Sequence, residues 1–550
     1  MGNDYDFEFE DMPVRYPVGE HSFRELRRGG YLYVDKTYYL ARLIKQGKFI
    51  FLSRPRRFGK SLMLSTIECF FRGEKELFEG TWIAPRVKEW KSYSVLHFDM
   101  SRTNGFNADT MLKHLNRRLE ALEAQYEMPI NSDSNDLGDR FSSLIEGIYK
   151  KTGKQVVILI DEYDNGILET LNDSEEEQEA MSDVLRSFYR QPKAMTECVR
   201  FCMVTGVARF GSYTLFSGGN NYLDISMMPN YASICGITQK ELLDNFQEGI
   251  KQLSSAHSMG HEEMIEALRL KYDSYRFTQS EELVYNPYSL LCAFTELRLD
   301  NFWIKTGISK VFVKYLSRSE FDLLELENLW VTRERMEAKY QKGDSIPLLF
   351  QTGYFTIKDI LDFKSFRLGI PNGEVRSALV DQLMPIYMGI SENQFSTLLT
   401  RLHVDLKKGE TNEWIKDIQS LISKIPHQLF GPLDSRSEDK EVRQKIVDSN
   451  ISHFERTYHI IIHMICQMIK VDIESEVSFS GGRADMVIKT NRFIYVIEFK
   501  LDSTTAEALK QIDDKGYLLP WHADGRKVYK VGIVFSSKLR NLSAYQFVEG

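Results

Sequence analysis

Residues 49–64 read FIFLSRPRRFGKSLML and decide the fold of the first part of this chain. The apolar run at 49–53 predicts a strand, and residues 62–71 predict a helix. Between them stand Gly59, Lys60 and Ser61, in the strand–turn–helix context of a phosphate-binding loop. The free N–H groups and the positive dipole end of such a helix attract an anion. We therefore expect Lys60 to reach the β- and γ-phosphates of a nucleotide and Ser61 to coordinate magnesium.

The loop departs from the generic GxxxxGK[ST] pattern at one position, where Arg54 replaces the first glycine. Arg54, Arg56, Arg57 and Lys60 nevertheless follow one another with no acid between them. Such a turn favours an anion, and a basic surface turn is the alternative interpretation.

A second element strengthens the nucleotide interpretation. Residues 156–164 read VVILIDEYD, and an unbroken aliphatic run is typical of a strand buried on both faces. Asp161 and Glu162 follow the run at its carboxyl end, where ligands bind in open α/β sheets. Asp161 is predicted to hold magnesium and Glu162 to polarise the attacking water. A solvated acidic strand end is the alternative, but its coincidence with the loop favours a nucleotide site.

A third apolar strand, at 201–205, ends at Thr205, and Arg209 follows shortly after it. We expect Thr205 to sense the γ-phosphate and Arg209 to respond to its loss. Helices expected at 37–46, 62–71, 108–125 and 175–189 alternate with strands expected at 49–53, 95–100, 156–160 and 201–205. This alternation predicts an α/β fold with a parallel sheet of the P-loop NTPase type.

The first two thirds of the chain resemble the AAA-ATPase-like family of bacterial proteins, which are similar to the STAND-type archaeal ATPases. The resemblance rests on RPRRFGKSLML, VVILIDEYD and YNPYSLL (285–291), with YVDKTYYLARLI (33–44), GITQKEL (236–242), KYDSYRF (271–277) and PLLFQTGYFTIKD (347–359). It spans about residues 10–375, and an arginine-rich loop is usual within it. It implies ATP binding with Mg²⁺, and we expect the ATP to be cradled by Arg57, Phe58, Gly59, Lys60, Ser61 and Leu62.

A second set of polar residues lies near the carboxyl end of the chain. Asp485 opens one predicted strand, and Glu498 and Lys500 close the next, on the same face of it. Two carboxylates and an ammonium suit Mg²⁺-dependent hydrolysis of a phosphodiester, because the carboxylates hold the ion and Lys500 activates water or steadies the phosphate. A surface strand with an ordinary Glu–Lys pair is the alternative.

This segment resembles the PD-(D/E)XK nuclease domain that often follows such an ATPase, over about residues 450–545. The motifs are GGRADMVI (481–488), IYVIEFK (494–500) and ALKQIDDKGY (508–517), and Ala484 stands where the family name has proline. The resemblance implies a restriction-endonuclease-like α/β fold with Asp485, Glu498 and Lys500 as the catalytic core. It implies that Gln511 and Tyr517 approach the nucleic acid backbone. Glu455 is a further candidate metal ligand, and Glu476 is its rival.

The domain boundaries are predicted from the places where the expected secondary structure changes along the chain. Successive helices are expected at 238–250, 262–272 and 289–298. We divide the chain into a P-loop domain (1–235), a helical lid or connector (236–375), a helical linker (376–440) and the nuclease-like domain (441–550).

Composition narrows the class of protein. The 550 residues carry 70 Lys and Arg against 78 Asp and Glu, so no overall basic excess indicates a nucleic-acid partner. The segment 451–550 is nearly neutral, so DNA or RNA binding there needs a local cluster of cations such as Arg483, Arg526, Lys527 and Lys530. Six scattered cysteines predict buried, reduced thiols, and no apolar run reaches membrane-spanning length. We expect a cytoplasmic protein without a membrane partner.

Two functions are consistent with these observations. The first is an ATP-binding protein, an ATPase, coupled to a magnesium-dependent nuclease, with DNA favoured over RNA as the substrate. The second is a nucleotide-gated scaffold or signalling ATPase, whose nuclease-like domain binds but does not cut. The intact set of Asp485, Glu498 and Lys500 favours the first function, and the neutral charge of 451–550 favours the second.

Overall fold

The structure is a computed structural model. It describes residues 14–101, 107–129, 136–210, 222–303, 329–338, 346–362, 364–387, 390–423, 472–479, 482–539 and 541–550. The chain divides into two compact units, Met1–Arg376 and Ser377–Gly550.

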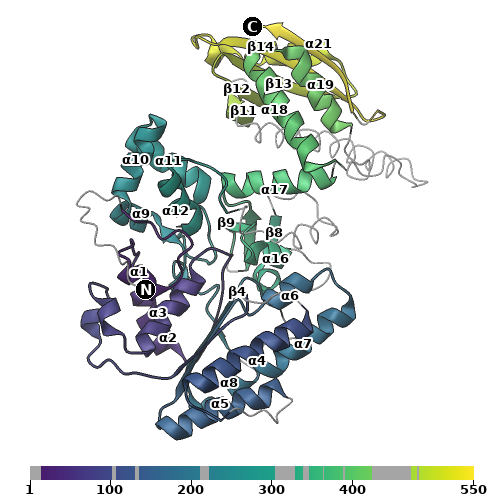
Figure 1. The fold of residues 1–550 in the computed structure, drawn as a ribbon. Helices are drawn as coiled ribbons and strands as arrows, with labels where there is room; N and C mark the ends of the chain where they lie inside the picture. Colours follow the sequence, from purple (N-terminus) through teal and green to yellow (C-terminus); the bar gives the residue numbers. More distant parts are fainter. Residues whose placement is uncertain are drawn as a thin grey trace. The chain divides into compact units, whose positions relative to one another are not determined.

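A five-stranded parallel sheet forms the centre of the N-terminal unit, as the alternation predicts (Figure 1). The strand order is β2-β3-β4-β1-β5, so β4 lies between the strand that leads into the phosphate loop and the strand that ends in the two acids. The side chains of β1 and β3 are buried throughout, because helices cover both faces of the sheet. The strands are β1 (Phe49–Ser53), β2 (Val95–Asp99), β3 (Val156–Asp161), β4 (Val199–Gly206) and β5 (Leu223–Asp224).

Helices cover both faces of this sheet. On one side lie α1 (Phe23–Arg28), α2 (Thr37–Gln46) and α3 (Lys60–Phe71), and on the other lie α4 (Ala108–Gln125), α5 (Leu137–Thr152) and α7 (Glu175–Tyr189) (Figure 1). Helices α4 and α7 each begin with a capping box, at Asn107 and Ser174. The short helices α6 (Asn165–Thr170) and α8 (Gln191–Ala194) complete this part.

The middle region begins with helices around their own core. The sequence predicts one helix over residues 238–250, but the structure has two helices there. The chain turns at Phe246, whose ring is buried. Tyr272, Leu290 and Phe294 pack in the same cluster, and Tyr16 stacks on Phe246 with ring centroids 6.0 Å apart. The helices are α9 (Gln239–Asn245), α10 (Gln247–His257), α11 (His261–Tyr272) and α12 (Pro287–Glu296), beside the short pair β6 (Ile237–Thr238) and β7 (Val284–Tyr285).

The expectation that the middle region is helical throughout 236–375 is wrong. An antiparallel sheet of order β8-β10-β9 occupies its last part, with α15 (Arg333–Met336) and α16 (Ile346–Gln351) beside it. In β8, Leu329 and Val331 are buried while the residues between and after them are exposed. Strands this short give too little alternation to be recognised in the sequence. They are β8 (Leu329–Thr332), β9 (Thr356–Ile360) and β10 (Ser365–Gly369).

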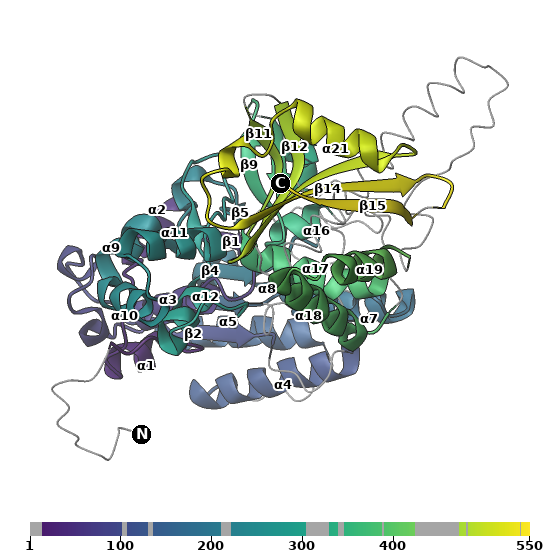
Figure 2. The ribbon, with the colours of Figure 1, turned by 90° about the horizontal axis from the view of Figure 1, so that it is seen from above.

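The C-terminal unit contains a mixed sheet of order β11-β12-β13-β14-β15, in which β13 and β14 are parallel. Figure 2 shows α21 (Thr505–Asp514) on one side of it and α18 (Glu392–Lys408) and α19 (Thr411–Ile422) on the other. Trp414 of α19 packs against Tyr495 and Phe547, so the expected linker helices belong to this sheet. The boundary between the units falls within α17 (Gly373–Tyr387). The strands are β11 (Asp472–Phe479), β12 (Gly482–Lys489), β13 (Phe493–Leu501), β14 (Lys527–Ser536) and β15 (Asn541–Glu549).

The described residues can be compared with two predictions from the composition, on the cysteines and on membrane-spanning segments. Five of the cysteines are buried free thiols, as predicted, and Cys466 lies outside the described residues. Among the described helices, none has the length and apolar character that a membrane span needs.

Candidate active sites

The phosphate loop lies at the carboxyl end of β1 and leads directly into α3. Gly59 adopts a left-handed conformation with a φ of 95°, which glycine tolerates without a steric cost. Lys60 follows it, and its Nζ donates hydrogen bonds to the carbonyl oxygens of Arg54 and Pro55, both at 2.9 Å. The Lys60 side chain therefore folds back onto the loop. A phosphate bound in the loop would lie close to its ammonium group.

A cavity of about 520 Å³ opens in front of this loop. That volume is within the range of small-molecule sites. The loop, the acids after β3 and the start of α12 all border it. Its lining includes Arg56, Arg57, Gly59, Lys60, Ser61, Leu62, Asp99, Asp161, Glu162, Pro287, Tyr288 and Leu291.

The two acids at the carboxyl end of β3, Asp161 and Glu162, both line this cavity. Asp161 is buried, and its Oδ1 accepts hydrogen bonds from the Thr205 hydroxyl and from the Glu162 N–H. Thr205 is therefore in contact with the predicted magnesium ligand, because β4 lies next to β3 in the sheet. Glu162 has a φ of 50°, a conformation that costs free energy in residues other than glycine. Burial raises the pKa of its carboxyl group, and the charges of Lys60 and Arg56 partly oppose this rise.

Asp164 is a functional candidate that the sequence interpretation missed. Its carboxylate is fully buried, and Oδ2 accepts hydrogen bonds from the N–H groups of Val207 and Ala208. Burial raises the pKa of Asp164 to about 6. The side chain fixes the turn after β4, and the repeated acid in DEYD was the available signal.

Tyr288 and its neighbours at the start of α12 form the opposite wall, which sequence reasoning also missed. Asn286 caps this helix by accepting hydrogen bonds from the N–H groups of Tyr288 and Ser289. The Arg57 guanidinium lies 5.2 Å from the centroid of the Tyr288 ring. An apolar cavity of about 90 Å³ adjoins the large one and shares Pro17, Gly59, Leu62, Pro287 and Leu291 with it. This wall suits the apolar faces of a nucleotide base.

The structure corrects three expectations for this site. Arg54 does not join the anion-binding turn, because its buried guanidinium donates to the carbonyls of Ser53, Ser226 and Tyr231. The ring of Phe58 packs on Tyr275 and Phe277, and the residue borders the adjoining apolar cavity instead of the large one. Arg209 does not line the cavity: it forms an ion pair with Asp224 at 3.0 Å and borders a different cavity.

In the C-terminal unit, the predicted catalytic residues converge. Glu498 and Lys500 both project from β13, and the Lys500 Nζ donates to the Glu498 Oε1 at 3.1 Å. Gln511 of α21 contacts both side chains, accepting a hydrogen bond from Lys500 at 2.8 Å and donating one to Glu498. Asp485 of β12 accepts the N–H of Phe499 at 2.8 Å, which places its carboxylate beside the other two.

The charge state of Glu498 reflects its surroundings. Burial raises the pKa of its carboxyl group to about 7, the Asp485 charge adds to this rise, and Lys500 opposes it. The Oε2 atom is buried and has no hydrogen-bond partner. A buried carboxylate oxygen without a partner, close to a second carboxylate, fits a divalent cation. Among the described residues, no third His, Cys, Asp or Glu joins them as a ligand cluster.

The other predicted nuclease residues have different outcomes. Tyr517 is only 1% exposed and packs in the core behind α21, so the expectation that it touches nucleic acid is wrong. Tyr517 lies beyond the end of α21 at Asp514, and it packs in one cluster with Leu509 and Ile512 of that helix. Glu455 lies outside the described residues, as does the side chain of Glu476. Candidate cations of this unit are paired with acids: Arg526 with Asp524, Lys527 with Glu549, and Lys530 with Asp513.

Two protein families match separate parts of the chain. The family described as Predicted AAA-ATPase matches residues 17–216, and the PD-(D/E)XK nuclease superfamily matches residues 453–545. The chain is 30% identical over 540 residues to an uncharacterized protein in the vnfD 5′ region of Azotobacter chroococcum mcd 1. That match covers 96% of this chain and 98% of the relative.

Among solved structures, the ORC2 protein of Aeropyrum pernix, in ADPNP-ADP complexes, is 13% identical. It covers 66% of this chain and 92% of its own, with a TM-score of 0.23, which does not establish a shared fold. The family assignment therefore rests on the sequence matches. The chain belongs to the predicted AAA-ATPase family and carries a C-terminal domain of the PD-(D/E)XK nuclease superfamily.

Proposed function

We propose that this protein binds and hydrolyses ATP in its N-terminal unit and hydrolyses nucleic acid phosphodiesters in its C-terminal unit, both with Mg²⁺. The observation that carries the proposal is that Lys60, Ser61, Asp161 and Glu162 line one cavity of nucleotide size. The convergence of Glu498, Lys500 and Gln511 beside Asp485 supports the second activity. The ATPase part comprises the P-loop domain with the middle region, and the nuclease part comprises the C-terminal sheet.

In the ATP site, the backbone N–H groups from Arg57 to Leu62 and the Lys60 ammonium bind the phosphates. The adenine lies against the apolar wall formed by Pro17, Pro287 and Leu291. Ser61 and Asp161 would hold Mg²⁺, which would neutralise part of the triphosphate charge. Glu162 accepts a proton from the attacking water, and burial raises the pKa of its carboxyl group, which makes it a stronger base.

In the nuclease site, Asp485 and Glu498 would hold the divalent cation, which would supply Lewis-acid chemistry at the scissile phosphate and lower the pKa of water. Lys500 lies on the same side of β13 and stabilises the charge that develops on the phosphate during in-line attack. Gln511 positions both side chains. Glu498 must lose its proton to act as a ligand, and a pKa of about 7 makes that loss available at physiological pH.

ATP acts as a switch in this proposal, because contacts to its γ-phosphate favour one arrangement of the residues around Asp161 and Thr205. We place the protein in the cytoplasm, which agrees with its buried free thiols. DNA is the preferred substrate over RNA.

The alternative is a nucleotide-gated scaffold whose nuclease-like domain binds nucleic acid or protein without cutting. The ion pairing of Arg526, Lys527 and Lys530 favours it, because cations that are paired attract phosphates less strongly.

The deciding experiment incubates the purified protein with DNA and RNA substrates, with and without ATP and Mg²⁺, and measures released phosphate and cleaved strands. The proposal predicts magnesium-dependent cleavage that Lys500→Ala abolishes. Binding of nucleic acid without any cleavage, at every metal and nucleotide condition, would establish the scaffold instead.

A further inference from the structure

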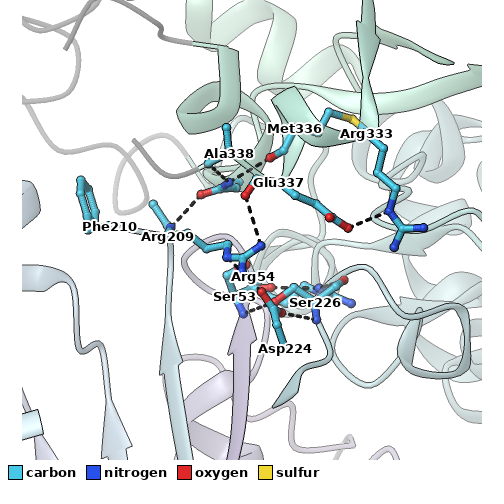
Figure 3. A network of polar contacts seen from close by, with 12 residues as sticks. Ser53, Arg54, Arg209, Phe210, Asp224, Ser226, Arg333, Met336, Glu337 and Ala338 are labelled. Carbon is cyan, nitrogen blue, oxygen red and sulfur yellow. Dashed lines mark hydrogen bonds and ion pairs between the residues drawn. The ribbon is translucent and has the colours of Figure 1, made fainter. Parts of the chain in front are cut away.

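A second cavity lies beside the phosphate loop in the N-terminal unit, and the proposed function does not use it. Its volume is about 260 Å³. Three arginines border it from separate segments: Arg54 follows β1, Arg209 follows β4, and Arg333 begins α15 (Figure 3). Met228, Phe277 and Met336 provide apolar wall.

The charges around this cavity do not balance. Arg209 pairs with Asp224 at 3.0 Å, and Arg333 pairs with Glu337 at 2.9 Å. Arg54 has no carboxylate within ion-pair distance among the residues that the structure describes. Among the described residues that line the cavity, the three arginines and the two acids therefore leave one positive charge without a counter-ion.

Arg54 holds this extra charge in an unfavourable environment. Its side chain is 1% exposed, and burial lowers the pKa of the guanidinium to about 10. The two Nη atoms donate to the backbone carbonyls of Ser53, Ser226 and Tyr231, but the buried Nε has no partner. A buried charge without a counter-ion costs free energy, and an anion in the adjoining cavity would reduce that cost.

We propose that this second cavity is a binding site for a small organic monoanion, a carboxylate with a short apolar chain. A single negative charge matches the single uncompensated positive charge. The planar fork of arginine suits a carboxylate, and the methionine and phenylalanine side chains suit a short hydrocarbon chain. Inorganic phosphate fits less well, because it carries more than one negative charge near neutral pH and has no apolar part.

The experiment titrates the full-length protein with acetate, butanoate and hexanoate by calorimetry at constant ionic strength. Saturable binding is expected, with the affinity rising about fourfold for each added methylene while the cavity has room. Arg333→Gln is expected to weaken hexanoate binding at least tenfold, because it removes a cation and leaves Glu337 unpaired. Arg335→Gln is the matched control, since Arg335 lies on the same short helix but does not border the cavity, and its affinity should equal that of wild type.

Arg57→Gln separates this site from the nucleotide site, because Arg57 borders only the larger cavity, and it should leave hexanoate binding unchanged. The proposal is overturned if no carboxylate binds saturably, or if Arg333→Gln binds as wild type does. It is also overturned if Arg57→Gln abolishes binding, which would place the carboxylate in the nucleotide cavity. ATP binding, measured separately, does not enter any of these outcomes.

Discussion

At the scale of single residues, Glu162 combines two features of a catalytic group. Its backbone is held at a φ of 50°, and burial raises its pKa. We expect Glu162→Gln to bind ATP within about threefold of wild type but to hydrolyse it at least about 100-fold more slowly, since general base catalysis contributes about that much. Phosphate release and nucleotide titration measure the two quantities. Glu169→Gln, which borders the same cavity and pairs with Arg56, is the control, and equal turnover in both variants would contradict the role.

Glu374 gives a pH dependence of stability that is independent of both sites. It is fully buried, accepts hydrogen bonds from the Ser289 hydroxyl and the Trp303 N–H, and has a pKa raised by burial to about 7. The folded pKa lies above the unfolded value of about 4.5. The stabilisation is therefore fully present below about pH 4.5 and is lost as the pH rises through 7.

We expect the free energy of unfolding of the N-terminal unit to fall by up to about 3 kcal/mol between pH 5 and pH 8 on account of Glu374. Denaturant titrations at both pH values measure this change. Glu374→Gln should lose most of the difference, whereas the exposed Glu76→Gln should keep it. An unchanged pH dependence in Glu374→Gln would show that the carboxyl group ionises normally.

At the scale of elements, the turn after α16 braces the phosphate loop. Gly353 has a φ of 89°, and a Cβ atom there would come within 2.6 Å of the Pro55 Cγ. We expect Gly353→Ala to displace the loop and weaken ATP binding about tenfold. Gly80→Ala is the matched control, because Gly80 has a φ of 74° with nothing within 4 Å of its Cβ position. Both variants should lose about 1 kcal/mol of stability, and only the first should change the nucleotide affinity. Equal affinities would exclude the bracing contact.

The elements that carry the sites were predictable because their patterns are strong. Buried parallel strands such as Val156–Asp161 are continuous aliphatic runs, and acids at their ends must lie at one edge of the sheet. Glu498 and Lys500 share a face of β13 by simple alternation. The three-stranded sheet of β8, β9 and β10 was missed, because its short strands contain polar and charged residues in place of a continuous aliphatic run.

The remaining errors concern neighbours that are distant in sequence. Arg209 follows the expected sensor strand, but its partner Asp224 lies on the edge strand β5, which no pattern predicted. Tyr517 follows α21, but the core behind this helix decides where its ring goes. Position along the chain predicts the element of a residue, whereas its partners depend on packing between elements.

At the scale of the whole molecule, the two sites belong to units with separate hydrophobic cores. Phe246, Leu290 and their neighbours form a core in the N-terminal unit, and Val496, Ile512 and their neighbours form one in the C-terminal unit. All residues proposed for ATP hydrolysis lie before Arg376, and all described residues proposed for phosphodiester hydrolysis lie after Ser377. A substitution in one site should therefore leave the chemistry of the other intact.

We expect Lys500→Ala to lower magnesium-dependent cleavage at least about 100-fold while ATP hydrolysis stays at the wild-type rate, because the lysine stabilises charge only at the scissile phosphate.

Lys60→Ala should lose ATP binding and yet cleave nucleic acid in the absence of ATP as wild type does. Cleavage by the wild type should respond to ATP, and cleavage by Lys60→Ala should not, because the response requires a bound γ-phosphate. Parallel assays of both activities on the two variants and on Lys515→Ala, an exposed lysine after α21, test this independence. If Lys60→Ala also stopped cleavage without ATP, the loop would be needed for the nuclease itself, and the two chemistries would not be separable.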